Sequence, residues 1–365
     1  MDLSENEKYW YWLASAPKIG LQKVLRVIQD GVELSEIFCD PAKIDFEKCK
    51  IPLDAQKNLL SRAHLDVIEA EIAALAAQEV QICTPIGKSY PPSLKEIHSP
   101  PALLYVKGDL DRLTQKCISI VGSRKASRKG MANIRSIARE LAENGVSVIS
   151  GMARGIDTAA HTGALEGGGV TVAVLGCGVD IVYPRENREI YEKICKTGAV
   201  VSEYAPGTPP VSGNFPVRNR IMNGISRGVL VGDAGIKSGA HITVRFACEE
   251  NRDIFALPSE ANAEAYELPN LLIAEGAYVC RHGQDILDFY GWESVFGCKE
   301  EGDFPSGLDF FEAGLYNLLL KGDMNMQQIV DAMREKPQRV NLTLTKMELR
   351  GLIERSAGNI FGIKN

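Results

Sequence analysis

Residues 118–134 have the sequence ISIVGSRKASRKGMANI. Ile118–Val121 predict a buried strand, a glycine follows it, and a helical pattern begins near Arg128. In α/β proteins, this order of strand, glycine and helix often forms a phosphate-binding site. The second and third glycines of a dinucleotide-binding fingerprint are missing, and residues 124–129 contain four basic side chains instead. The stretch therefore predicts an α/β fold in which basic side chains contact phosphate together with the backbone.

The surrounding chain continues the alternation of strands and helices. Helical patterns separate six short runs rich in β-branched residues: Ile118–Val121, Val146–Ile149, Val170–Leu175, Ala199–Val201, Gly228–Val231 and Asp253–Leu257. This order is typical of βαβ units, so residues 80–290 predict a doubly wound, mostly parallel sheet. Such sheets bind ligands at the C-terminal ends of their strands, near the switch point. The residues expected there are rich in glycine and serine, which suits an anion site made of backbone amides.

A smaller helical region precedes this core. Residues 1–78 predict an N-terminal all-α domain, because Leu21–Ile28 and Leu65–Leu75 show apolar residues at helical spacing. The turn Pro17–Gly20 is weakly similar to that of a helix–hairpin–helix or SAM-like module. The pattern leaves open whether this domain contacts a DNA backbone or serves packing and interaction.

The C-terminal part separates into a linker and a third domain. Residues 291–306 lack periodicity and predict a linker. Within residues 307–365, Met326–Met333 and Val340–Leu352 predict a helix-turn-helix pair, and Ser356–Ile363 predict a β-wing. Together they outline a winged-helix-like domain, and a small protein-interaction domain remains the alternative.

Composition narrows the class of protein. The chain has 365 residues, of which 45% are hydrophobic and 24% are charged, as in ordinary globular proteins. No apolar run approaches the ~20 residues of a membrane span, and the polar, acidic start is not a secretory signal. The nine cysteines are scattered without a C-x-x-C pair, which indicates reduced thiols in the cytoplasm and neither disulfides nor a structural metal.

The net charge of −6 alone argues against nucleic-acid binding, but the local distribution favours it. Lys116 to Arg139 contain seven basic residues and no acidic one, and Arg218 to Arg227 contain three arginines and no acid. Because charges are screened over ~8–10 Å, such local patches matter more than the total.

The densest stretch is FPVRNRIMNGISRGVLVGDAGIKSGAHITV, residues 215–244. On a helix beginning near Pro216, Arg218 and Arg220 diverge by roughly 200° and cannot bind one phosphate from the same face. One arginine can grip an anion while the other braces an acidic neighbour or the next phosphate, with Asn219 between them as donor and acceptor. A solvated helix face is the simpler alternative.

Lys237, Ser238 and Gly239 precede another predicted helix. Ser238 can be an ordinary N-cap, or the three residues can form an anion cradle together with the helix N-terminus. The sequence contains no P-loop pattern, so ATP hydrolysis is not predicted.

No catalytic constellation stands out. Asp157 and His161 are four residues apart on one helix face, but His161 is better explained as a packing or capping histidine. The G-x-S-x-G pattern and a paired carboxylate motif are both absent. The sequence therefore predicts a non-catalytic protein without a cofactor.

Arginines beside a single glycine suit a ligand that presents several phosphates in a row. A dinucleotide has one pyrophosphate and needs closely approaching backbone. The pattern therefore favours a nucleic-acid strand that crosses the C-terminal ends of the strands.

Ordered motifs over roughly residues 85–280 support this expectation. They are Tyr90-Pro91 with Leu94, PPALLYVKG at 100–108, VGSR at 121–124, SGMARGID at 150–157, HTGAL at 161–165, AVLGCGVDIVYPREN at 173–187, SEYAPG at 202–207 and FPVRNRI at 215–221. In this order they closely resemble the DNA-processing protein A (DprA/Smf) family. The chain departs from that family's pattern at Asp233, Val244-Arg245, Ser259 and Glu267–Asn270, which affects the expected rim of the site.

The resemblance implies an extended Rossmann-like core that binds single-stranded DNA and forms a homodimer. It also implies protection of incoming strands in natural transformation and loading of the RecA recombinase. The family's DNA pocket falls on Gly122, Ser123 and Arg124 and on Phe215, Arg218, Asn219 and Arg220. Phe215 would stack on a base, with a core position as the alternative. With the neighbouring polar and glycine positions, the predicted DNA-binding residues are Gly122, Ser123, Arg124, Ser127, Arg128, Gly151, Phe215, Arg218, Asn219, Arg220, Lys237, Ser238 and Gly239.

One alternative class stays open. The same broad superfamily includes phosphoribohydrolases with a P-G-G-x-G-T loop, which would fall near Gly232–Thr243. The sequence there is GDAGIKSGAHIT, without the double glycine and with an added lysine. This departure disfavours a nucleotide-hydrolysing enzyme.

Overall fold

The computed structural model describes residues 3–28, 33–113, 116–260, 266–292, 310–320, 322–333, 337–356 and 359–363. The chain divides into two compact units, Met1–Gly297 and Cys298–Asn365. Except for Gly291 and Trp292, the predicted linker 291–306 lies outside the described residues. In the described part, no helix combines the length and apolar character that crossing a membrane requires.

The first unit is built on a sheet that has nine strands among its described residues. The strands, in sheet order, are β1 (Gln81–Cys83), β2 (Leu104–Gly108), β6 (Ala199–Ser202), β5 (Thr171–Leu175), β4 (Ser147–Ser150), β3 (Cys117–Val121), β7 (Gly228–Val231), β8 (Asp253–Ala256) and β9 (Tyr278–Val279). All neighbouring pairs among β3–β9 are parallel, whereas β2 is antiparallel to β1 and β6. The predicted mostly parallel sheet is confirmed, and its six predicted strands match to within one residue at each end.

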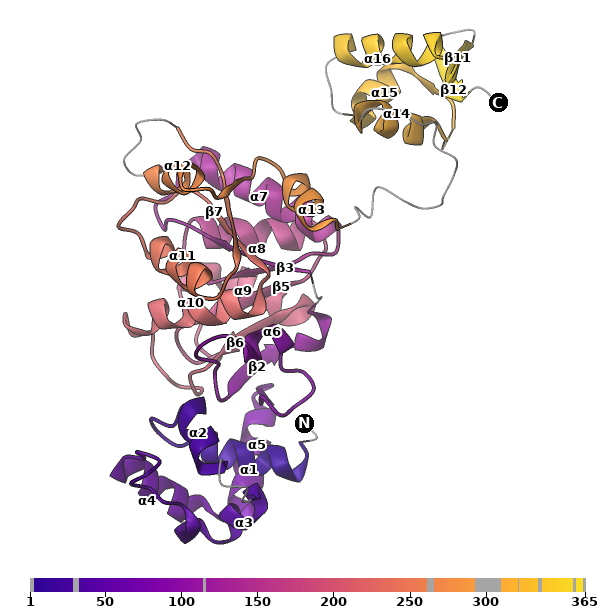
Figure 1. Cartoon of the computed structure of the whole chain (residues 1–365). Helices are drawn as coiled ribbons and strands as arrows, with labels where there is room; N and C mark the ends of the chain where they lie inside the picture. Colours follow the sequence, from indigo (N-terminus) through magenta and orange to yellow (C-terminus); the bar gives the residue numbers. More distant parts are fainter. Residues whose placement is uncertain are drawn as a thin grey trace. The chain divides into compact units, whose positions relative to one another are not determined.

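Helices cover both faces of the sheet (Figure 1). One face carries α7 (Arg128–Glu143), α8 (Ile156–Glu166), α9 (Arg188–Thr197) and α13 (Gly283–Tyr290), and the other carries α6 (Pro92–Lys95), α10 (Asn214–Ile225), α11 (Gly239–Glu249) and α12 (Glu267–Ala274). Because side chains alternate along a strand, Ile118 and Ile120 of β3 pack with α7 and α8. Ser119 points the other way and donates to the Met222 carbonyl of α10 over 3.1 Å.

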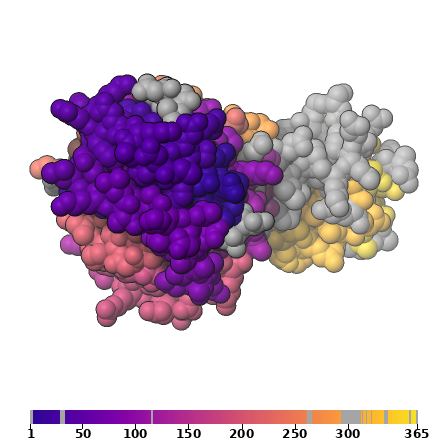
Figure 2. Space-filling view, turned by 90° about the horizontal axis from the view of Figure 1, so that it is seen from below, coloured from indigo at the N-terminus to yellow at the C-terminus, as the bar shows by residue number. Residues whose placement is uncertain are grey.

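The N-terminal helices pack on one end of this unit (Figure 1). They are α1 (Glu5–Ala14), α2 (Leu21–Ile28), α3 (Leu34–Cys39), α4 (Leu53–Arg62) and α5 (Leu65–Ala77). Two buried indoles anchor them: Trp12 Nε1 donates to the Leu59 carbonyl over 3.0 Å, and Trp10 Nε1 donates to the Ala102 carbonyl beside β2 over 2.7 Å. Figure 2 shows their residues, in indigo and purple, as one continuous surface.

The second unit has its own small core. Its elements are α14 (Phe310–Leu320), β10 (Met324–Asn325), α15 (Met326–Met333), α16 (Pro337–Leu349), β11 (Ile353–Ser356) and β12 (Ile360–Ile363), with the antiparallel order β10-β12-β11. Leu315, Ile329, Leu344 and Phe361 are buried together. This arrangement confirms the predicted winged-helix-like outline. The last helix ends at Leu349, earlier than predicted, because the chain turns toward β11 through a glycine of positive φ.

The topology leaves a site-forming crevice next to β3. From β3 the chain builds β4, β5 and β6 to one side and then crosses back to place β7 on the other side of β3. Loops after the two adjacent strands therefore diverge at their C-terminal ends, where α/β sheets bind ligands. Val121 of β3 is in register with Val231 of β7, so the loops that follow these residues border the same crevice.

Candidate functional site

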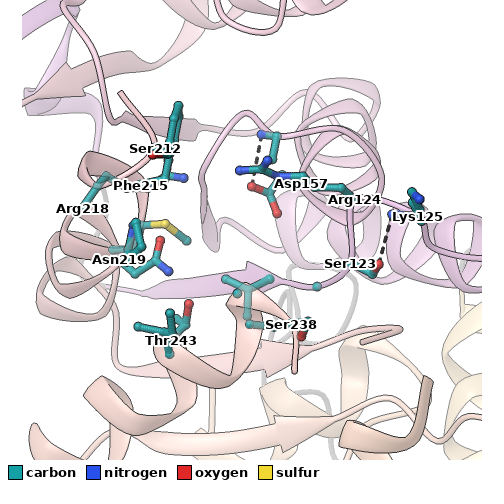
Figure 3. A pocket seen from close by; sticks show the side chains of 18 of the residues that line it. Ser123, Arg124, Lys125, Asp157, Ser212, Phe215, Arg218, Asn219, Ser238 and Thr243 are labelled. Carbon is teal, nitrogen blue, oxygen red and sulfur yellow. Dashed lines mark hydrogen bonds between the residues drawn. The ribbon is translucent and has the colours of Figure 1, made fainter. Parts of the chain in front are cut away.

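A pocket of about 610 Å³ lies at the C-terminal end of β3. The loop after β3, the beginning of α8, the N-terminal half of α10 and the beginning of α11 form its walls (Figure 3). Helix α11 begins at this cavity, with Ser238 and Gly239 in the lining. This placement favours negatively charged ligands, because helix N-termini offer free N–H groups and a partial positive charge.

Eight of the thirteen predicted site residues line this pocket: Gly122, Ser123, Arg124, Phe215, Arg218, Asn219, Ser238 and Gly239. Gly151 lines a smaller adjoining crevice. The other four, Ser127, Arg128, Arg220 and Lys237, do not line the pocket.

Arg218 is a buried structural cation as well as a wall of the pocket. Only 5% of its surface is exposed. Its Nη1 donates to the Gly151 carbonyl over 2.7 Å and to the Val174 carbonyl, at the ends of β4 and β5. A Cβ on residue 151 would lie 2.5 Å from the guanidinium, so only glycine lets Arg218 approach this closely. Burial lowers the pKa of Arg218, and the charge of Asp157 opposes this shift.

Asp157 is a buried carboxylate whose charge acts on this cation. It lies in the first turn of α8 and lines the pocket, and its Oδ2 accepts from the Ala153 N–H over 3.2 Å. Burial raises its pKa to about 6, while the positive charge of Arg218 acts in the opposite direction. Asp157 and Arg218 therefore hold the loops after β4 and β5 against α10.

Arg220 faces away from the pocket. Its Nη2 donates to both carboxylate oxygens of Glu203, each over 2.8 Å, and only 9% of its surface is exposed. The predicted divergence of Arg218 and Arg220 around the helix is thus present. Arg220 braces an acidic neighbour, and it is not placed where it could contact a ligand in the pocket.

Phe215, Arg124 and Tyr183 form a cluster of two aromatic rings and one guanidinium in the wall of the pocket. Phe215 is half-buried, and its ring packs on the backbone of Gly176. The guanidinium carbon of Arg124 lies 5.6 Å from the Phe215 ring centroid. The ring of Tyr183 lies 5.5 Å from that of Phe215, tilted by 36°. Phe215 is therefore not a core residue, and Arg124 and Tyr183 surround its accessible part.

Tyr183 was not predicted from the sequence. It lies in a loop without helical or strand periodicity, inside the motif AVLGCGVDIVYPREN at 173–187, which assigned it no role. Two signals were available: this motif, and a bulky aromatic shortly after the end of a predicted parallel strand, where ligand-binding loops lie.

Ser127 and Asp233 fix the loop that carries Arg124. Ser127 caps α7 by accepting from the Gly130 N–H over 2.9 Å, and its hydroxyl donates to Asp233 Oδ2 over 2.6 Å. The Asp233 carbonyl accepts from the Ser123 N–H over 2.6 Å. Asp233 therefore fixes the conformation of the Arg124 loop without lining the pocket itself.

The remaining departures from the family pattern lie away from the pocket. Val244 is buried in the core, and Arg245 pairs with Glu249 one turn further along α11. The Ser259 hydroxyl donates to the Tyr266 carbonyl over 2.5 Å, and the Asn270 amide bonds to the Ser259 backbone. These departures leave the lining residues unchanged.

Ser238 has the position of an N-cap without that function. It precedes α11, but its side chain makes no capping hydrogen bond. Its hydroxyl is buried and has no hydrogen-bond partner among the described residues. Because it lines the pocket beside Gly239, the hydroxyl and the first N–H groups of α11 are available to a ligand.

The acid-free run 116–139 is partly neutralised in three dimensions. Arg135 pairs with Glu166 of α8, and Arg139 pairs with Glu143 over 2.7 Å. Arg124, Lys125 and Arg128 form no ion pair within the described residues. The unpaired positive charge is thus concentrated next to the pocket rather than along all of α7.

A sequence model of the family described as DNA recombination-mediator protein A matches residues 81–291. This range is more than half of the chain and extends from β1 to just beyond α13. The chain belongs to this family. The resemblance to DprA/Smf proteins that the sequence motifs indicated is therefore confirmed.

Similar proteins and solved structures agree with membership of this recombination-mediator family. DNA processing protein DprA of Streptococcus pneumoniae is 36% identical over 279 residues, 76% of this chain and 96% of that protein. Protein Smf of Synechocystis is 43% identical over 216 residues, 58% of this chain and 54% of that protein, so the chain spans about half of its length.

The X-ray structure of DprA from Streptococcus pneumoniae has a TM-score of 0.68 at 34% identity and covers 79% of this chain and 98% of its own. The structure of DNA processing protein A from Helicobacter pylori has a TM-score of 0.53 at 29% identity, and the match covers 58% of this chain and 98% of that chain. The Helicobacter pylori structure is described by its single-stranded DNA binding mode.

Proposed function

We propose that the core binds single-stranded DNA at the pocket beside β3 and does so without catalysis. The observation that carries this proposal is the half-buried Phe215 ring, which shares a pocket with Arg124 and the N-terminus of α11. Sites for single strands combine an aromatic stacking surface with positive charge along the backbone path. The single-stranded DNA binding mode of the Helicobacter pylori relative also supports it.

The lining residues have different roles in this proposal. Arg124 contacts a phosphate, because its side chain is exposed and forms no ion pair within the described residues. Phe215 stacks on a base, and the Asn219 amide offers a donor and an acceptor to a base edge. Ser123, Ser238 and Gly239 add hydroxyl and backbone donors. The role of Arg218 is to position these groups by joining β4, β5 and α10.

Arg128, Lys237 and Ser127 lie outside the pocket. Arg128 and Lys237 are exposed, and their proposed contribution is a general attraction for the phosphates that flank the bound nucleotide. Ser127 contributes through the α7 cap, and Arg220 contributes through its pair with Glu203. Gly122 gives the loop its close approach to Ile156, since a side chain at position 122 would collide with that residue.

A non-catalytic role fits the charges of the pocket. Asp157 is the single carboxylate among its lining residues. It is buried, accepts a backbone hydrogen bond and faces Arg218, so it is engaged in structure. A nucleotide-release assay discriminates this proposal from a phosphoribohydrolase-like activity, for which free base or ribose phosphate would accumulate.

The family membership supports further proposals. These are homodimerisation through the Rossmann-like core, protection of incoming DNA in natural transformation, and loading of the RecA recombinase. An apolar sheet edge supports the dimer, because Tyr278 and Val279 of the last strand and the neighbouring Phe289 are 48%, 44% and 38% exposed. The described cysteines are free thiols, which is in keeping with a cytoplasmic location.

Salt dependence tests the proposed function. If four or five phosphates are neutralised, the logarithm of affinity for a single-stranded oligonucleotide falls against log[salt] with a slope of about −3. Fluorescence anisotropy with a labelled oligonucleotide, single-stranded and as blunt duplex, measures this slope. The proposal fails if affinity is independent of salt or if the duplex is bound equally well.

Arg124→Ala should weaken binding and flatten that slope by up to about 0.7, the value for one phosphate contact on a single strand. Arg139→Ala is the matched control, because Arg139 belongs to the same basic run but pairs with Glu143 on α7. Its slope should equal that of the wild type. Equal changes in both variants would show that general charge, and not the pocket, attracts the strand.

A further inference from the structure

A small crevice of about 40 Å³ adjoins the main pocket. Its lining residues are Arg124, Gly151, Ala153, Arg154, Tyr183, Pro184 and Phe215. Four of them, Arg124, Ala153, Tyr183 and Phe215, also line the main pocket. The two cavities therefore adjoin along the Arg124–Phe215–Tyr183 group, and a strand that leaves one can enter the other.

Tyr183 presents an aromatic ring at this boundary. Its side chain is 41% exposed, and its hydroxyl makes no hydrogen bond within the described residues. The ring is tilted by 36° relative to Phe215 and does not stack on it face to face. An exposed ring that neither fills the core nor uses its hydroxyl is suited to stacking on a nucleobase.

Arg154 supplies a cation on the same side. Its side chain is 65% exposed and pairs with Glu186, which is 49% exposed. An ion pair this exposed adds little to stability, so a phosphate can replace the carboxylate as the partner of the guanidinium. The crevice is thus lined by a second aromatic ring and a second guanidinium, those of Tyr183 and Arg154, beside the Phe215–Arg124 contact of the main pocket.

We propose that Tyr183 and Arg154 form a second nucleotide subsite. The Tyr183 ring stacks on the base next to the one on Phe215, and Arg154 contacts the adjoining phosphate after it releases Glu186. This inference rests on the proposed binding of single-stranded DNA. If the subsite exists, the DNA strand runs from the main pocket across Tyr183. It does not run along α7 past Lys125 and Arg128.

Photo-crosslinking tests the subsite in the wild-type protein. An oligothymidylate that contains 5-iodouracil is irradiated in complex with the full chain, and crosslinked peptides are identified by mass spectrometry. Crosslinks at both Phe215 and Tyr183 are expected. Crosslinks at Phe215 alone overturn the subsite and leave the proposed function intact. Crosslinks at neither residue, with no measurable affinity for the oligonucleotide, overturn both.

Substitutions provide the quantitative test. Tyr183→Phe keeps the ring and should bind as the wild type does, whereas Tyr183→Ala should lose about 5- to 150-fold in affinity, the range for one base–aromatic stack. The salt slope should not change, because no charge is removed. Arg154→Ala should flatten the slope by up to about 0.7, and Arg128→Ala should flatten it less. Wild-type affinity of a folded Tyr183→Ala protein would refute the subsite.

Discussion

Arg218→Ala is expected to lower the free energy of unfolding by about 3–5 kcal/mol, the usual cost of leaving a buried charge uncompensated. Three losses contribute. The carbonyls of Gly151 and Val174 lose a buried donor, and each unsatisfied buried acceptor is costly. Asp157 keeps its negative charge without the neighbouring cation. The cavity left beside Gly151 removes packing as well.

The effect should depend on pH in a defined direction. Burial raises the pKa of Asp157 from an ordinary value near 4 to about 6. The folded state therefore holds more protons than the unfolded state between these values, and this group's contribution to stability falls as pH rises through that range. Without Arg218 the pKa of Asp157 rises further. The difference in stability between Arg218→Ala and the wild type should therefore be larger at pH 8 than at pH 5.

Urea denaturation followed by circular dichroism at pH 5 and pH 8 measures both effects. Arg245→Ala is the control, because Arg245 is exposed and its contacts, with Glu249 and the Phe246 ring, lie on its own helix α11. The stability of this variant should change by less than about 0.5 kcal/mol. The double variant Arg218→Ala/Asp157→Asn should recover stability at pH 8 because the unpaired charge is gone. An Arg218→Ala protein of wild-type stability that has lost DNA binding would instead make Arg218 a direct phosphate ligand.

This expectation differs from what local sequence could predict. The helical period correctly separated Arg218 from Arg220, but it gave no means of deciding which one faces a ligand. Their partners lie far away along the chain: Gly151 is 67 residues from Arg218, and Glu203 is 17 residues from Arg220. Tertiary contacts of this kind decide whether an arginine binds a ligand or holds loops together.

The edge of the sheet that carries the site was predictable for a physical reason. Strands buried on both faces need continuous β-branched runs, and these runs located β3–β8 and thus the loops at their C-terminal ends. The two- and three-residue strands β9 and β1 are too short to show a pattern. Tyr183 was missed for a related reason, since its loop has no period.

Charge counting along the sequence was informative only in part. The acid-free run 116–139 predicted a local basic patch with seven positive charges. In the folded chain, Glu166 from α8 and Glu143 from the next turn of α7 neutralise two of its arginines. Arg124, Lys125 and Arg128 form no ion pair within the described residues, and the first two lie where the loop after β3 meets the pocket.

Phe215→Ala should weaken binding of single-stranded DNA by about 1–3 kcal/mol and leave the salt slope almost unchanged, because it removes a stacking surface and no charge. The ring is half-buried and packs on Gly176, so a modest drop in melting temperature is also expected. Phe215→Trp keeps a stacking face and should retain most of the affinity. Val217→Ala, at a 44% exposed position on the same helix, should change neither quantity.

The comparison of the two large effects separates binding from folding. Arg218→Ala lowers stability and reduces affinity only as the pocket loosens, whereas Phe215→Ala lowers affinity in a protein that remains folded. Anisotropy titrations at two salt concentrations, together with melting curves of the same samples, resolve the two. If a stable Phe215→Ala protein binds with full affinity, the ring is not the stacking surface. In that case the role of Phe215 would be to position the Arg124 guanidinium, which lies 5.6 Å from the centre of its ring.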